Sequence, residues 1–220
     1  MLQEFLRQYP NAVDLDDSRF DTHFPEGIKR SDFLLFDRLT ICEFKEIRNI
    51  GIRNRVEYLL GKYEGKCQGF KRNLYNSISL ALSKSNKQIC DTKIALGLPE
   101  ALGLVILENM IPSDLSVVTL IDAVDRKMLN GLDSVDAVLC TDFVNIYSDA
   151  DGNPFRPIQI VTRKTVQSKL LYHLVGRLIQ DFCSINNTPI TTGASIKKAD
   201  QKWVVTNDGK YQKYVSTFEM

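Results

Sequence analysis

Two short apolar runs separated by Asp37-Arg38 constrain the fold of this chain more than any other feature. The first run covers residues 33–36 and the second covers residues 39–47. Both runs predict β-strands, and the polar pair between them predicts a turn that joins the strands into an antiparallel hairpin. Side chains of strand residues alternate between the two faces of a sheet, so we expect Asp32 to share a face with Leu34.

The register of this hairpin decides whether its acidic residues meet. With a loop of two or four residues, opposed residues have numbers that sum to 75, and Asp32 then lies opposite Glu43. A three-residue loop would shift the pairing by one, and Asp37-Arg38 lacks the glycine that tight hairpin turns favour. Opposed carboxylates repel each other, and a bound cation would turn that repulsion into attraction. Lys45, on the same face as Glu43, adds a cationic donor.

Charge is segregated along the chain although the net charge is only +1. Residues 43–90 carry 10 Lys or Arg against 4 Asp or Glu, and residues 151–220 carry 10 against 5. Residues 91–150 carry 3 against 10. Two basic segments separated by an acidic one suit an anionic partner bound on one side. The alternative is that the fold intermixes the segments and leaves no charged face.

Length, composition and cysteine usage indicate a single cytoplasmic domain. A chain of 220 residues with 44% hydrophobic and 25% charged residues is typical of a globular domain that buries its own core. The five cysteines are odd in number and scattered, without a CxxC pair, which favours reduced thiols over disulfides or a zinc site. We find no signal peptide and no apolar run of membrane-spanning length, so we expect a soluble, intracellular protein.

The remaining pattern predicts an α/β or α+β chain built on one main sheet. Helices are expected over residues 2–9, 47–62, 68–83, 114–129 (with Asp114 as N-cap) and 166–182, the last burying Leu170, Leu171, Leu174, Leu178 and Ile179. Strands are expected over residues 102–108, 135–147 and 158–162, the first being apolar enough for a central strand covered on both faces. Residues 13–30 are expected to be irregular, and residues 84–98 to contain a loop. Residues 203–214 predict a C-terminal β-hairpin around an Asn-Asp-Gly turn.

Basic residues interleaved with aromatic ones follow the hairpin in sequence. This combination suits binding to the phosphate backbone and bases of a nucleic acid, and it equally suits the solvated faces of two amphipathic helices. The candidate nucleic-acid-binding residues are Arg48, Arg53, Arg55, Lys62, Lys66, Lys71 and Arg72.

Other catalytic motifs are missing from the sequence. It has no glycine-rich phosphate-binding loop, no GxGxxG, no HExxH and no GxSxG. With only two histidines in the sequence, we do not expect a catalytic triad or a histidine-rich metal site. The acidic run at residues 149–153 superficially resembles a calcium loop, but Ile160 stands at the twelfth position where that loop needs an acidic ligand. We interpret this run as a turn.

The hairpin resembles the motif of the PD-(D/E)XK nuclease superfamily. That superfamily carries an Asp on one strand and a Glu-x-Lys triplet on the next, which here are Asp32 and Glu43-Phe44-Lys45. Ser31 stands where the superfamily commonly has proline. In the order of elements the resemblance covers roughly residues 1–110. It implies a restriction-endonuclease-like domain over residues 1–220, with a mixed central sheet flanked by helices, residues 111–220 completing the sheet and adding a helix and the C-terminal hairpin.

The resemblance also implies a function for these residues. Asp32, Glu43 and the backbone carbonyl of Phe44 would be ligands of Mg²⁺ or Mn²⁺, and Asp32, Glu43 and Lys45 would be catalytic. The implied activity is metal-dependent hydrolysis of DNA, with RNA as the alternative substrate, by an endonuclease or exonuclease. The implied roles are restriction, phage defence or repair, and a homodimer or a partner subunit is among the implied assemblies. Two alternatives remain: a catalytically inactive subunit that binds nucleic acid or a protein partner, and a solvent-facing ladder of ion pairs without function.

Overall fold

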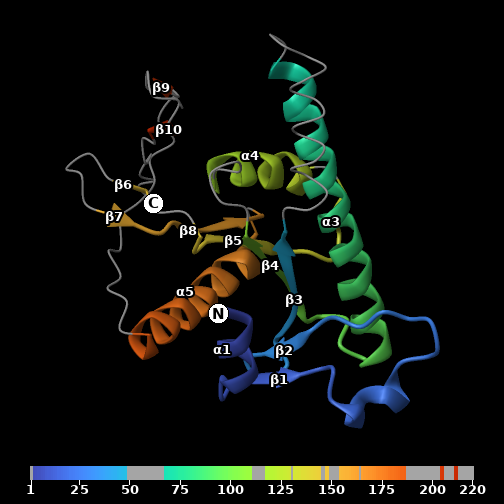
Figure 1. Ribbon diagram of the computed structural model, residues 1–220. Helices are drawn as coiled ribbons and strands as arrows, with labels where there is room; N and C mark the ends of the chain where they lie inside the picture. Colours follow the sequence, from blue (N-terminus) through green and yellow to red (C-terminus); the bar gives the residue numbers. More distant parts are fainter. Residues whose placement is uncertain are drawn as a thin grey trace.

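A six-stranded mixed sheet with helices on both faces forms the framework of the chain (Figure 1). The strand order is β1-β2-β3-β4-β5-β8. This computed structural model describes residues 2–48, 67–110, 117–129, 131–144, 147–148, 154–163, 165–186, 204–205 and 211–212. The predicted α/β class with one main sheet is confirmed.

The sheet and its helices follow the sequence in a simple order. The strands of the main sheet are β1 (Ala12–Asp14), β2 (Phe33–Leu35), β3 (Thr40–Ile47), β4 (Leu102–Asn109), β5 (Ala137–Asp142) and β8 (Ile158–Thr162). The helices are α1 (Leu2–Gln8), a 3-10 helix η1 (Ser18–His23), α3 (Cys67–Ala95), α4 (Val117–Met128) and α5 (Val166–Ile185). Two short pairs, β6 (Tyr147–Ser148) with β7 (Pro154–Phe155) and β9 (Val204–Val205) with β10 (Tyr211–Gln212), lie outside the main sheet.

The centre of the sheet is parallel and its edges are antiparallel. Strands β3, β4 and β5 run parallel, whereas β2 pairs antiparallel with β3, and β8 pairs antiparallel with β5. The crossovers from β3 to β4 and from β4 to β5 proceed in the same direction across the sheet. Because such crossovers are right-handed, their helices α3 and α4 lie on the same face.

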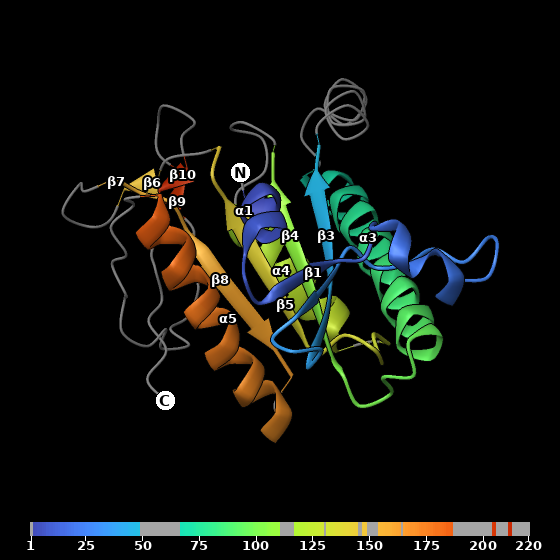
Figure 2. The same ribbon diagram turned by 90° about the horizontal axis from the view of Figure 1, so that it is seen from below.

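Each face of the sheet has its own hydrophobic core. The core on one face combines α3 and α4 with strand residues that include Ile41 and Val105. The core on the other face combines α1 and α5 with strand residues that include Phe33, Cys42 and Ile106 (Figure 2). All eight residues of β4 are buried, as expected for a strand that is covered on both sides.

A four-residue turn with an unusual backbone joins β2 to β3. Phe36, Asp37 and Arg38 have φ values of 55°, 53° and 69°, and the N–H of Leu39 donates to the carbonyl of Phe36 at 3.0 Å. Residues other than glycine adopt this left-handed region at a cost. The hairpin therefore forms without the glycine that its turn would favour.

Two predictions about the helices are wrong. Helix α3 continues past the predicted end at residue 83 as far as Ala95, because Ile89 and the buried polar residues Ser85 and Thr92 continue its inward face. The loop that we expected within residues 84–98 begins only at residue 96. Leu170 is 50% exposed, whereas Leu171, Leu178 and Ile179 are buried as predicted. Val175, which was not predicted, completes the inward stripe of α5.

Some of the remaining predictions about helices and strands differ from the structure, and others fall largely outside the described residues. Residues 13–30, which we expected to be irregular, contain part of β1 and all of η1. Most of the helix expected over residues 47–62 lies outside the described residues, as does Asp114. The C-terminal hairpin is represented by the short β9–β10 pair alone, with the rest of it outside the described residues. Within the described ranges, no helix combines the length and the apolar character that crossing a membrane would require.

Candidate active site in the β2–β3 hairpin

The observed register of the hairpin brings Asp32 and Glu43 together. The paired residues are Phe33 with Cys42, Leu34 with Ile41, and Leu35 with Thr40. Continued by one residue, the same register places Asp32 opposite Glu43. The four-residue loop thus gives the pairing that we predicted, because it keeps the sum of opposed residue numbers at 75.

Asp32 binds the backbone of β3 through its side chain. Its Oδ2 accepts a hydrogen bond from the N–H of Phe44 at 2.6 Å. Strand β2 begins only at Phe33, so the carboxylate takes the place that a backbone carbonyl would have in a longer strand. Because the N–H and C=O of a strand residue point to the same neighbour, the carbonyl of Phe44 is directed to the edge of β3 where Asp32 lies.

Glu43 is a buried carboxylate whose negative charge is only partly compensated by neighbouring groups. Its side chain is 0% exposed and forms an ion pair with Nζ of Lys45, which is 31% exposed. Neither carboxylate oxygen of Glu43 has a partner of hydrogen-bond geometry in the described part of the chain. A buried charge is costly unless it is paired and hydrogen-bonded, so this carboxylate retains the capacity to accept donors or bind a cation.

Burial changes the acid–base behaviour of both carboxyl groups. Desolvation, followed by the charge of Asp32, raises the pKa of Glu43 to about 7, although Lys45 and Ser31 oppose this shift. Desolvation also raises the pKa of Asp32, against the lowering effects of the Phe44 N–H and Lys45. Carboxyl groups with such shifts in a cluster are typical of functional sites, although buried ion pairs produce them too.

Ser31 is a member of the site that its sequence pattern did not reveal. It is fully buried, and its hydroxyl is close enough to Glu43 to be among the groups that lower the pKa of that carboxyl. Its Oγ has no hydrogen-bond partner of normal geometry within the described ranges. Only the register of β2 against β3 brings the two residues together, since they are twelve positions apart in sequence.

The candidate nucleic-acid-binding residues can be placed only in part. Arg48 is exposed directly after β3 and forms an ion pair with Glu46. Lys71 and Arg72 lie on α3, with side chains outside the described part. Arg53, Arg55, Lys62 and Lys66 lie outside the described residues altogether.

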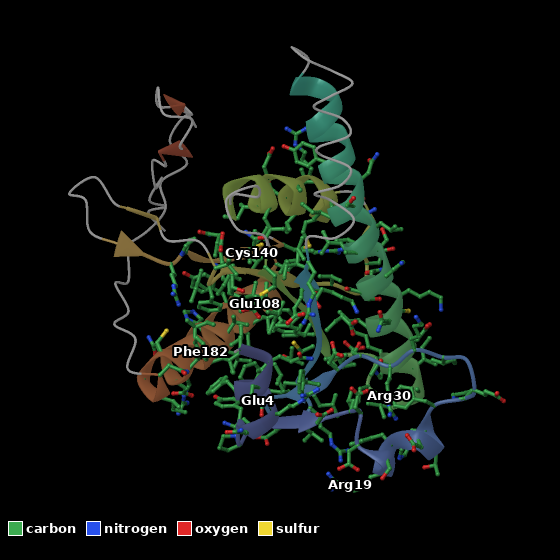
Figure 3. The ribbon with its side chains drawn as sticks, in the orientation of Figure 1. Glu4, Arg19, Arg30, Glu108, Cys140 and Phe182 are labelled. Carbon is green, nitrogen blue, oxygen red and sulfur yellow. The ribbon has the colours of Figure 1, made fainter. Side chains whose placement is uncertain are left out.

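A second pair of acidic residues lies on the opposite face of the sheet. Glu46 and Glu108 are paired on the parallel strands β3 and β4, and Glu108 lies in the interior (Figure 3). Desolvation and the charge of Glu46 are the causes that raise the pKa of Glu108. Glu4 lies exposed on α1, where it forms an ion pair with Arg7.

The described residues contain no group of three or more His, Cys, Asp or Glu side chains arranged to hold a metal ion. The hairpin offers two carboxylates and a backbone carbonyl. Mg²⁺ commonly takes one or two carboxylates and completes its shell with water and phosphate, so a two-carboxylate site is within its chemistry.

Comparisons with known proteins leave the site to be judged on its own geometry. No family model matches the chain, and neither the curated proteins nor the solved structures include a match.

Proposed function

We propose that the chain is a metal-dependent phosphodiester hydrolase of the PD-(D/E)XK type, with a restriction-endonuclease-like core and with DNA as its substrate, RNA being the alternative substrate. The observation that carries the proposal is the placement of Asp32 opposite Glu43, with Lys45 paired to Glu43 at the same end of a buried hairpin. The mixed sheet with a parallel centre supports it as well.

The residues of the hairpin fit a hard divalent cation. Both oxygens of Glu43 are buried, Lys45 is paired to one of them, and Asp32 adds a second carboxylate. Oxygen ligands of this kind suit Mg²⁺ or Mn²⁺. Asp32, Glu43 and the carbonyl of Phe44 would hold the ion. When bound, it would polarise a phosphoryl oxygen and lower the pKa of an attacking water.

The side chains of the chain have separate roles in this proposal. Lys45 is partly exposed and lies beside Glu43, where its ammonium group would orient the attacking water and offset negative charge in the transition state. Asp32 keeps the edge of β3 in place through the N–H of Phe44. The burial of Glu43 excludes bulk water, which strengthens its interaction with a nearby cation.

Cleavage assays with matched variants test the proposal. Purified protein is incubated with plasmid, linear duplex, single-stranded DNA and RNA, in Mg²⁺, Mn²⁺ or EDTA. We expect cleavage that needs the metal and falls by about 100-fold or more in Glu43→Gln and Lys45→Ala. Glu108→Gln is the matched control, because it neutralises a similarly buried carboxylate on the opposite face of the sheet. Cleavage that is equal in wild type and Glu43→Gln would contradict the proposal.

A second candidate function is a subunit that binds nucleic acid or a protein partner without catalysis. The ion pair between Lys45 and Glu43 favours it, because it compensates the buried charge without a cation. This candidate predicts salt-dependent binding to DNA that is unchanged in Asp32→Ala, and no heat of Mn²⁺ binding by calorimetry. Metal binding that disappears in Asp32→Ala would exclude it.

A further inference from the structure

A single peptide unit in front of the site is held at both ends by helix α3. The carbonyl of Arg30 accepts a hydrogen bond from Nε2 of Gln88 at 3.1 Å. The N–H of Ser31, in the same peptide unit, donates to Oγ1 of Thr92 at 2.9 Å. Gln88 and Thr92 are four residues apart and therefore lie on the same side of the helix. Figure 3 shows Arg30 beside the C-terminal end of α3.

This peptide lies at the point where the position of Asp32 is decided. Asp32 follows it directly and precedes β2, so the β2–β3 ladder does not hold its backbone. Asp32 itself accepts two hydrogen bonds: its carbonyl accepts from the N–H of Leu15 at 2.9 Å, and its carboxylate accepts from the N–H of Phe44. Fixing the preceding peptide sets the direction in which the chain enters β2.

Ser31 connects this peptide to the other carboxylate of the site. Its hydroxyl is buried near Glu43, and its N–H is bonded to Thr92, which is buried as well. A proline at this position would have no N–H to donate. The departure of this chain from the superfamily's common proline therefore makes the bond to Thr92 possible.

We propose that Gln88, Thr92 and Ser31 form a positioning device in which α3 holds Asp32 opposite Glu43 through the Arg30–Ser31 peptide. The bond from Phe44 N–H to Asp32 reports directly on this placement. The catalytic consequence rests on the proposed function, whereas the effect on the Asp32–Phe44 bond does not.

Amide hydrogen exchange in the metal-free protein tests the device without any activity. Thr92→Val removes the acceptor and nearly keeps the shape of the side chain, Thr92→Ser keeps the acceptor, and Ser83→Ala removes a hydroxyl from the exposed face of the same helix. We expect the Phe44 amide to exchange at least about tenfold faster in Thr92→Val, relative to the Ile106 amide of the neighbouring β4. The ratio should keep its wild-type value in Thr92→Ser and Ser83→Ala. An unchanged ratio in Thr92→Val overturns the inference.

Kinetics and metal binding give a second, independent reading. In Thr92→Val we expect Mn²⁺ affinity and kcat to fall about tenfold or more while KM for duplex DNA is unchanged, with Thr92→Ser restoring both. If wild type neither binds Mn²⁺ nor cleaves, the proposed function fails, and the exchange ratio alone decides whether α3 positions Asp32. If Thr92→Val loses activity only in proportion to its loss of folded protein, the positioning role in catalysis is wrong.

Discussion

The buried carboxyl group of Glu43 couples the stability of the chain to pH. Its pKa is raised from 4.5 to about 7 in the folded state, chiefly by desolvation. Between these values the folded chain keeps the proton that the unfolded chain has released, so stability falls as pH rises. Above pH 7 the resulting decrease in stability is on the order of 3 kcal/mol.

Chemical denaturation of the metal-free protein at pH 5, 6, 7 and 8 measures this effect. Glu43→Gln removes the titration and keeps the shape of the side chain, so its stability should decline less from pH 5 to pH 8 than that of wild type. The pKa values of Asp32 and Glu108 are raised as well, so these two residues also make stability fall as pH rises, in wild type and in Glu43→Gln alike. A decline of equal size in wild type and Glu43→Gln would show that Glu43 is ionised in the folded protein across this range.

At the scale of the elements, the beginning of β4 is fixed by a glycine. A Cβ atom at Gly103 would lie 1.9 Å from the backbone oxygen of Ser134 and 3.1 Å from a methyl group of Ile89. The N–H and carbonyl of Gly103 are both hydrogen-bonded to Asp136, at 2.7 and 2.8 Å. The close backbone contact leaves no room for a side chain at Gly103. The two hydrogen bonds hold the strand in place, so β4 would have to shift to accept one.

Two glycine-to-alanine variants should therefore change stability in opposite directions. Gly103→Ala should destabilise the chain by about 1–3 kcal/mol through overpacking. Gly176 lies in α5, and among the described residues no atom beyond its chain neighbours and the nearby backbone of the same helix lies within 4 Å of an added Cβ. Alanine at this position should stabilise the helix by up to about 1 kcal/mol. Urea unfolding midpoints measure both changes. A loss of stability in Gly176→Ala as large as that in Gly103→Ala would contradict this account of the packing.

The elements also show which parts of the site can be predicted from the sequence. The predicted pairing of Asp32 with Glu43 depended on the length of the hairpin loop as well as on the alternation of side chains. The four-residue turn gives this pairing, whereas a three-residue loop would have shifted it by one. Polarity predicted the end of α3 too early, at residue 83 instead of Ala95, since the polar residues Ser85 and Thr92 are buried in tertiary contacts. The bond from Ser31 to Thr92 joins residues 61 positions apart, and no local pattern encodes a partner at that distance.

At the scale of the whole molecule, the basic segment lies in sequence between the two elements that build the site. The chain passes from β3, which carries Glu43, through the basic residues to α3, which holds the peptide before Asp32. Residues 43–90 carry 10 Lys or Arg against 4 Asp or Glu. If this segment meets the phosphates of DNA, binding must weaken with salt, because each neutralised phosphate releases counterions.

Charge removal on α3 should reveal whether basic side chains there neutralise phosphates. We expect the double variant Lys71→Ala, Arg72→Ala to bind a short duplex more weakly and to reduce the slope of log K against log salt by about 0.9 for each phosphate that is no longer neutralised. Lys87→Ala is the matched control on the same helix, because Lys87 is exposed and paired with Asp91 one turn away. Fluorescence anisotropy in EDTA between about 50 and 200 mM salt measures binding without cleavage. A double variant with the slope and affinity of Lys87→Ala would show that these two residues do not bind the phosphates.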